Sequence, residues 1–213
     1  MSNCPITSVG RYLLRPLCPL AKPLFGRVFN ITVLGKENIP PQGPYIVASN
    51  HRSHLDPPVL NFAFPDALVF LAKEELFKPP LGWLIKHMRA IPVRRGKGDT
   101  QILEASLELL EAGCSLAIFP EGTRAEPGKF LKPKVGVGLL AVKSGVPVVP
   151  VLIEGTDRVF PRAQKLPRPG HPIRVYVGKP ESFQNYEDNL KAYREVALYI
   201  MERIKSLAPP RPS

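Results

Sequence analysis

The chain of 213 residues contains few cysteines, and their placement shows no recognisable pairing. Cys4, Cys18 and Cys114 are odd in number and show no C-x-x-C spacing. A disulfide framework and a cysteine zinc site are therefore not expected, and the pattern is typical of a reducing, cytosolic setting.

Long apolar runs and internal repeats are also missing. No stretch offers the roughly 20 apolar residues that cross a bilayer, and the N-terminus has no signal-peptide pattern. Residues 11–36 are apolar and basic, contain no Asp or Glu, and are expected to be broken into short pieces by Pro16, Pro19 and Pro23. Such a segment either lies on an anionic bilayer as a bent anchor or packs against the domain.

Acidic residues are scarce: 18 Asp and Glu stand against 29 Lys and Arg, which gives a formal net charge of +11. This excess indicates an anionic partner, which is a nucleic acid, an anionic membrane surface, a phosphorylated substrate or an acidic protein. No nucleic-acid partner is expected, because the chain has neither an RRM-like aromatic signature nor zinc-finger spacing.

Apolar runs alternate with helical patterns along the chain. Strands are expected at 43–50, 67–72, 90–95, 115–120, 146–153 and 173–178, and helices at 59–64, 81–88, 98–113, 135–145 and 189–207. The alternation predicts an α/β fold with a largely parallel or mixed central sheet flanked by helices, preceded by an N-terminal membrane-associating helical segment. Ligands bind beyond the carboxyl ends of such strands, so 51–56, 94–95 and 120–124 are the candidate site segments.

The sequence HRSHLD places His51 and Asp56 five residues apart. Neither a helix nor a strand brings side chains at this spacing together, so they can meet only across a turn. Asp56 then either caps the next helix, whose first position suits Pro57, or holds His51 as a base. The simplest alternative for His51 is a loop histidine bonded to backbone.

Metal and covalent chemistry have little support in the sequence. His54 extends the pattern to H-x-x-H-x-D, but no third histidine or cysteine completes a zinc site. The chain has no G-x-S-x-G elbow, Walker A loop or G-x-G-x-x-G turn. We therefore expect the base to activate a hydroxyl of the substrate, with no metal or nucleotide cofactor.

The hexamer FPEGTR, residues 119–124, follows an apolar strand. Gly122 allows close backbone approach, Thr123 offers a hydroxyl, and Arg124 offers a bidentate fork for phosphate or carboxylate. Glu121 is placed to accept a substrate hydroxyl or to orient Arg124. An ordinary turn with an exposed Glu–Arg pair is the alternative.

Further basic residues flank these segments. Arg94 and Arg95 end the strand at 90–95, and Lys129, Lys132 and Lys134 precede the helix at 135–145. They form either an anion site or a solvated basic loop.

Together these pieces resemble the motifs of glycerolipid acyltransferases of the 1-acylglycerol-3-phosphate acyltransferase type. NHRSHLD is similar to their N-H-x4-D (HX4D) motif, AIPVRRG to the second motif, FPEGTR to the third and VPVVPV to the fourth, in the family's order. Lys134 and Gly136 resemble the K-x-G that follows the third motif. The resemblance covers roughly residues 30–180, and it departs at Arg94 and in the loop after FPEGTR.

The resemblance implies transfer of a fatty acyl group from acyl-CoA or acyl carrier protein to a lysophosphatidate-like acceptor, giving phosphatidate without a cofactor. His51 would be the general base and Asp56 would orient it. Arg95, Arg124 and Lys134 would hold the acceptor phosphate. Glu121 and Gly122 would border the glycerol, and Thr123 would be a further substrate-binding residue.

The resemblance also sets the expected organisation. Residues 1–29 are the membrane-associating segment, 30–208 the acyltransferase domain and 209–213 a disordered tail. We expect a peripheral or monotopic enzyme on the cytoplasmic face of a membrane. Two alternatives stay open: a non-catalytic basic module that binds anionic membranes, and an acyltransferase for another lysolipid or glycerol 3-phosphate.

Overall fold

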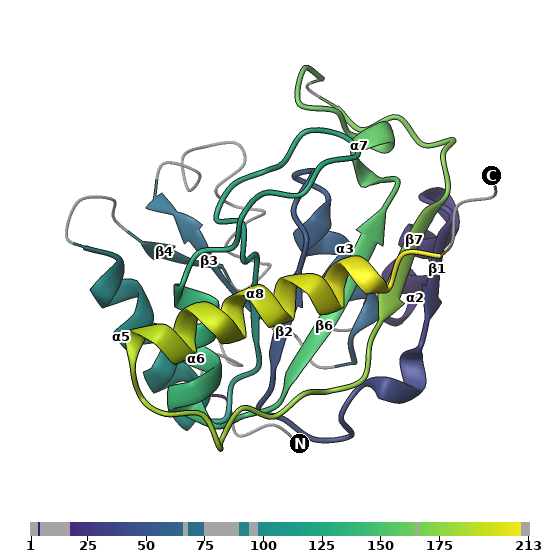
Figure 1. Ribbon diagram of the computed structural model, residues 1–213. Helices are drawn as coiled ribbons and strands as arrows, with labels where there is room; N and C mark the ends of the chain where they lie inside the picture. The colour runs from purple at the N-terminus through teal and green to yellow at the C-terminus, as the bar shows by residue number, and fades with distance from the viewer. Residues whose placement is uncertain are drawn as a thin grey trace.

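One mixed sheet carries the fold in the computed structural model, which describes residue 4 and residues 18–65, 68–74, 90–93, 98–164 and 166–209. Within these residues the seven strands lie in the order β1-β7-β6-β2-β5-β3-β4 (Figure 1). Neighbouring strands pair in parallel, except that β6 and β7 are antiparallel. The strands are β1 (Ile31–Leu34), β2 (Ile46–Ser49), β3 (Val69–Lys73), β4 (Ala90–Val93), β5 (Leu116–Ile118), β6 (Val148–Glu154) and β7 (Ile173–Val177).

Helices cover both faces of this sheet. The described helices are α2 (Cys18–Val28), α3 (Asp56–Ala63), α5 (Gly98–Glu111), α6 (Gly136–Ser144), α7 (Thr156–Val159), α8 (Leu190–Ser206) and the short 3-10 helix η2 (Lys36–Asn38). Figure 1 shows α8 running across one face beside α5 and α6, with α2 and α3 behind the sheet. The predicted α/β fold with a mixed sheet between helices is confirmed.

The central strand β2 shows how the core is divided. Ile46 and Ala48 pack with the α5, α6 and α8 side, whereas Tyr45 and Val47 pack with the α3 side. All four side chains are completely buried. A strand buried on both faces reads as a continuous apolar run, which is why this segment was recognisable in the sequence.

Some expectations fall on residues that the structure does not describe. The expected helix at 81–88, the second-motif arginines Arg94 and Arg95, and residues 5–17 of the N-terminal segment all lie outside the described residues. Within the described ranges, no helix is both long and apolar enough to span a bilayer. Strand β1 was not predicted, because its four residues lie inside the segment read as a basic anchor.

Helix α2 corrects the expected effect of the N-terminal prolines. Pro23 lies inside the helix instead of ending it, although an interior proline costs about 3 kcal/mol. Tertiary packing offsets this cost: the Phe25 ring lies 6.1 Å from Phe62 of α3, and the Lys22 ammonium donates to the Phe64 carbonyl at 3.3 Å. Helix α2 is therefore docked on the domain.

A disulfide joins Cys4 to Cys114, so the expectation of unpaired cysteines is wrong for these two residues. Both are buried in the core on the α5, α6 and α8 side. They are 110 residues apart in the sequence, and local spacing carries no information on a pair that only the fold brings together. The cysteines therefore no longer argue for a reducing setting.

The contact between α6 and α8 yields a prediction about Gly138. A Cβ atom at this position would lie 1.9 Å from the Tyr193 carbonyl oxygen of α8. Gly138→Ala should therefore lower the free energy of unfolding by about 1–3 kcal/mol, despite the roughly 1 kcal/mol that alanine gains over glycine in a helix. Urea unfolding followed by circular dichroism measures the change.

Gly136→Ala is the matched control in the same helix. Its Cβ would meet only a methyl group of Leu103, at 3.2 Å. This variant should unfold near the wild-type urea concentration. A Gly138→Ala protein as stable as the control would show that the two helices do not approach as closely as described.

Candidate active site

The first and third motifs lie side by side because their strands are neighbours. Strand β2 pairs in parallel with β5, with Ile46 opposite Leu116 and Ala48 opposite Ile118. The loops that follow the two strands therefore start at the same edge of the sheet, toward the top in Figure 1. This is the edge at which the sequence predicted the site.

His51 and Asp56 meet across the turn between β2 and α3. The His51 Nδ1 atom lies 2.8 Å from Asp56 Oδ2. The same oxygen accepts hydrogen bonds from the backbone N–H groups of Arg52, at 2.7 Å, and Ser53, at 2.8 Å. Asp56 is completely buried, so its carboxylate fixes the whole loop in place.

The geometry corrects the capping interpretation of Asp56. Helix α3 begins at Asp56 and its N-cap is Leu55, whose side chain makes no capping bond. The carboxylate instead faces back toward the preceding loop and accepts its N–H groups. Pro57 follows within the first turn, where a missing N–H costs no helical bond.

This hydrogen bond defines what the His51 ring can do. With Nδ1–H donating to a carboxylate, Nε2 is the ring nitrogen that carries the free lone pair. The ring stacks on Phe119, with centroids 4.0 Å apart and planes 17° from parallel. The His51 side chain is 17% exposed, so the ring is held in one orientation and is still reachable.

Glu121 of the third motif is hydrogen-bonded to the loop of the first motif. Its Oε1 accepts the His51 N–H at 3.0 Å, and its Oε2 accepts the Leu131 N–H at 2.8 Å. The residue is only 3% exposed, and the Ala125 N–H donates to the His51 carbonyl at 2.8 Å. Glu121 thus holds two backbone segments in place. These two hydrogen bonds are enough to account for its burial, without the expected contact to Arg124 or to a substrate hydroxyl.

Gly122 and Lys134 form the next contact of the site. Gly122 has a φ of +66°, and a Cβ there would lie 2.6 Å from Lys134 Cε. The Lys134 N–H donates to the Pro120 carbonyl at 2.8 Å. The lysine stem therefore lies along the glycine and leaves its ammonium, like Thr123, exposed at the surface of the site.

Arg124 and His54 share one partly exposed environment. Burial lowers the pKa of Arg124, and the nearby charge of Arg162 lowers this pKa further. Burial also lowers the pKa of His54, with added contributions from Arg124 and His51. Among the described residues no carboxylate accepts a hydrogen bond from His54, so His51 is the histidine with the geometry of a base.

Asn50 and Ser53 hold the His51 loop, and nothing in their local sequence identifies this role. The Asn50 amide accepts the Ile153 N–H at 2.7 Å and donates to the Ile153 carbonyl at 2.9 Å. The Ser53 hydroxyl donates to the Phe160 carbonyl at 2.9 Å. The loop is therefore fastened to β6 and to the end of α7 as well as to the FPEGTR segment.

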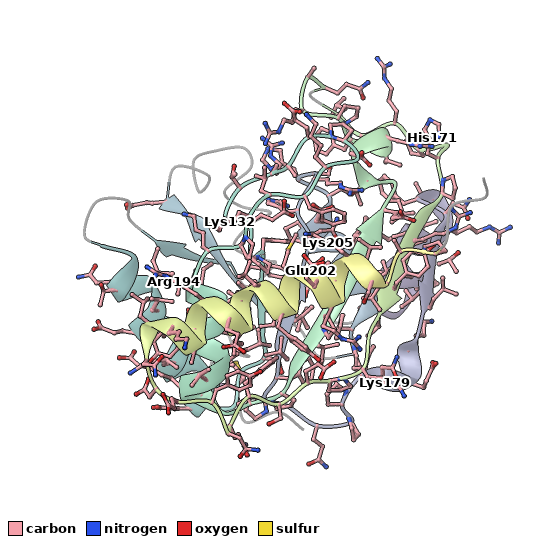
Figure 2. The ribbon with its side chains drawn as sticks, viewed as in Figure 1. Lys132, His171, Lys179, Arg194, Glu202 and Lys205 are labelled. Carbon is pink, nitrogen blue, oxygen red and sulfur yellow. A yellow bond between two sulfur atoms is a disulfide. The ribbon has the colours of Figure 1, made fainter. Side chains whose placement is uncertain are left out.

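Arg52 and Phe130 connect the site to the last helix. The Arg52 guanidinium lies 4.9 Å from the centroid of the Phe130 ring, and Lys205 of α8 lies 6.0 Å from it. Figure 2 shows Lys205 with Lys132 on the face of the molecule that α8 covers. Such cation–π contacts hold the loop that also carries Leu131 and Lys134.

The arginine of the second motif and a metal ion are the two remaining features considered from the sequence. Arg95 lies outside the described residues, and its strand β4 ends at Val93, separated from β2 by β5 and β3. Within the described part of the chain, no group of three or more His, Cys, Asp or Glu side chains could hold a metal ion.

Comparison with known proteins identifies relatives over most of the chain. Residues 30–154 match the family described as Acyltransferase. The chloroplastic 1-acyl-sn-glycerol-3-phosphate acyltransferase BAT2 of Brassica napus is 33% identical over 156 residues, which are 71% of this chain and 45% of that protein. The alpha enzyme of the same name from Mus musculus is 32% identical over 157 residues, covering 72% of this chain and 54% of that protein.

A solved structure agrees with these matches. The 1-acyl-sn-glycerophosphate (LPA) acyltransferase PlsC from Thermotoga maritima is 32% identical, with a TM-score of 0.73, and the match covers 92% of this chain and 79% of that one. The chain spans about half the length of the two curated relatives. Since the family match covers more than half of the 213 residues, the chain belongs to the acyltransferase family.

Proposed function

We propose that the chain is an O-acyltransferase that moves a fatty acyl group from an acyl thioester to the free hydroxyl of a lysophosphatidate-like acceptor. The product would be phosphatidate, an intermediate of phospholipid synthesis. The observation that carries the proposal is the His51–Asp56 pair, in which a buried carboxylate holds Nδ1 at 2.8 Å and leaves Nε2 free. The names of the relatives and of PlsC describe the same reaction class.

The reaction uses His51 twice. Its Nε2 takes the proton of the acceptor hydroxyl while the oxygen attacks the thioester carbonyl carbon. The Asp56 carboxylate stabilises the imidazolium that forms. The carbon–sulfur bond then breaks, and His51 returns the proton to the departing thiolate. Acyl-CoA and acyl carrier protein both supply such a thioester, and the bonds and protons of the reaction balance without a cofactor.

Acceptor binding is assigned to the exposed side of the FPEGTR loop. Arg124 and Lys134 would hold the phosphate, with Arg95 added on the resemblance of the second motif. Gly122 and Thr123 would border the glycerol, because both are exposed and Gly122 lies against the Lys134 side chain. Fixing the acceptor at its phosphate makes attack by its hydroxyl effectively intramolecular.

The acceptor tail and the product belong in a bilayer, so the enzyme is proposed to work as a peripheral or monotopic protein on the cytoplasmic face of a membrane. Helix α2 supports this proposal. Its Leu24 is 63% exposed and its Val28 is 47% exposed, and residues four apart share one helix face. Lys22 and Arg27 are exposed on the same helix, which suits an anionic surface.

The proposal predicts that His51→Ala lowers acyl transfer about 10²–10⁴-fold, because the general base is lost. His54→Ala, the matched control, should have a much smaller effect. The measurement is thiol release from acyl-CoA and from acyl carrier protein, each with lysophosphatidate, glycerol 3-phosphate and a monoacylglycerol as acceptor. Near-normal transfer by His51→Ala, together with loss of transfer in His54→Ala, would show that His54 and not His51 is the base.

Glu121 tests how far positioning controls the rate. Glu121→Gln leaves one backbone N–H facing an NH₂ group, so the protein should lose about 1–3 kcal/mol of stability and kcat should fall about tenfold to hundredfold. KM for the acceptor should change little. Glu126→Gln, in an exposed pair with Lys129, is the control. A rise in KM at unchanged stability would instead make Glu121 a substrate contact.

The proposed membrane contact of α2 can be tested by point substitutions that leave the helix in place. The double variant Leu24→Asp/Val28→Asp should weaken binding to vesicles that contain anionic lipid, since two apolar side chains no longer bury and two negative charges are added. Leu198→Asp on α8, where the leucine is 48% exposed, is the control. Equal sedimentation of both proteins with vesicles would place the membrane contact elsewhere.

A further inference from the structure

Arg162 reaches the candidate site from outside the four motifs. It lies on the connection between α7 and β7, and its Nη2 donates to the backbone carbonyl of Arg124, the last residue of FPEGTR. The two arginines are 38 residues apart in the sequence. The fold therefore brings the Arg162 guanidinium to the backbone of Arg124, close enough for its charge to add to the lowering of the Arg124 pKa by burial.

Two carboxylates lie near this pair, since the charge of Asp56 partly opposes the lowering of the Arg124 pKa by burial, and the charge of Arg162 adds to the lowering of the Glu126 pKa that the hydrogen bond from Lys129 causes. Among the described residues, neither Arg124 nor Arg162 forms an ion pair with Asp or Glu. Asp56 is buried, with its Oδ2 bonded to the His51 loop, and the nearby Glu126 is held by Lys129 at 2.8 Å. The like charge of Arg162 lowers the pKa of Arg124, after the larger effect of burial.

Two neighbouring cations without a carboxylate partner favour a dianion. A phosphate monoester carries a charge of about −1.5 to −2 near pH 7, whereas a phosphodiester carries one negative charge and a monoacylglycerol none. A guanidinium has five N–H donors in a planar fork. Arg162 uses one nitrogen on the Arg124 carbonyl, so its remaining donors are available to phosphate oxygens.

We propose that Arg162 is a second residue that binds the acceptor phosphate, and that with Arg124 it makes the site select a phosphate monoester over a phosphodiester or an uncharged acceptor. The inference rests on the proposed acyl transfer and narrows it to one acceptor class. Arg162 is exposed, and its charge also lowers the pKa of His54, as the smallest of several causes.

A purely structural role for Arg162 makes a different prediction. If the side chain only clamps the Arg124 carbonyl, glutamine should substitute for it, since glutamine keeps an N–H donor and loses only the charge. Lysine keeps the charge and loses the fork. Arg162→Gln and Arg162→Lys therefore separate clamping from phosphate binding.

The test compares these two variants with Arg168→Gln, which removes the same charge from the same connection. Arg168 is exposed, and its own backbone N–H is bonded to the Val159 carbonyl. Each full-length protein is given lysophosphatidate, lysophosphatidylglycerol or monoacylglycerol in micelles of an uncharged detergent. Acceptor binding is measured by calorimetry without an acyl donor, and kcat and KM are measured with one.

Arg162→Gln should weaken binding of lysophosphatidate and raise its KM about tenfold relative to the other two acceptors. A change of about tenfold is the effect expected from losing one charged hydrogen bond that solvent partly screens. Arg162→Lys should keep most of the preference, and Arg168→Gln all of it. Equal losses in Arg162→Gln and Arg168→Gln, or an equal loss for all three acceptors, would overturn the inference.

The two proposals fail in different ways. A wild-type protein that binds lysophosphatidate selectively but transfers no acyl group would refute the proposed reaction and leave the binding role of Arg162 intact. A wild-type protein that transfers acyl groups, with a preference that Arg162→Gln does not change, would refute the role of Arg162 alone. A wild-type protein that shows no preference for the monoester, in binding or in KM, would also refute the role of Arg162.

Discussion

The hydrogen bonds to one oxygen of Asp56 are the constraint on which the site depends. Burying a carboxylate is costly unless donors surround it, and here the His51 ring and the N–H groups of Arg52 and Ser53 all point at Oδ2. The start of α3, where the residue sits, adds a favourable dipole. The bonds that make this burial tolerable also fix the orientation of the His51 ring, so removing the carboxylate would disturb the fold together with the proposed chemistry.

Two further groups extend this constraint across the sheet. Glu121 bonds the His51 loop to the loop before α6, and Asn50 bonds the same loop to β6. Each uses both of its polar side-chain atoms on backbone groups. The His51 ring is therefore held by neighbouring strands of one sheet, and the loops that follow these strands have little freedom to move it.

The sequence predicted the parts of this arrangement that depend on local pattern. Apolar runs located β2, β5, β6 and β7, and a spacing argument brought His51 and Asp56 together across a turn. The same argument also allowed a cap for Asp56, because Pro57 signals a helix start without showing which way the carboxylate faces. Strand β1 escaped detection because its apolar residues merge with a basic segment, and its partner β7 is distant in sequence.

Long-range partners account for the rest of what the sequence did not show. Glu121 bonds to a residue 70 positions away, and Cys4 pairs with a residue 110 positions away. The FPEGTR hexamer suggested an outward Glu–Arg pair, but burial turned the glutamate inward and left the arginine near Arg162. No pattern within a short window could separate these two outcomes, because the choice is made by the strand that lies alongside.

The inward acids and outward cations also bear on turnover. Oδ2 of Asp56 and both carboxylate oxygens of Glu121 are bonded to backbone and ring N–H groups, and both residues are buried. In the proposed reaction the charged groups that face the acceptor would therefore be cationic, in a chain of net charge +11. Cations that hold the phosphate of the acceptor hold that of the product equally well, and such uniform binding does not speed the reaction. What differs after transfer is the loss of the hydroxyl from His51 and the gain of a second acyl chain, each CH₂ of which prefers a bilayer by about 0.8 kcal/mol. In the proposed reaction, contact with a membrane is therefore what would let a phosphate-binding site release its product.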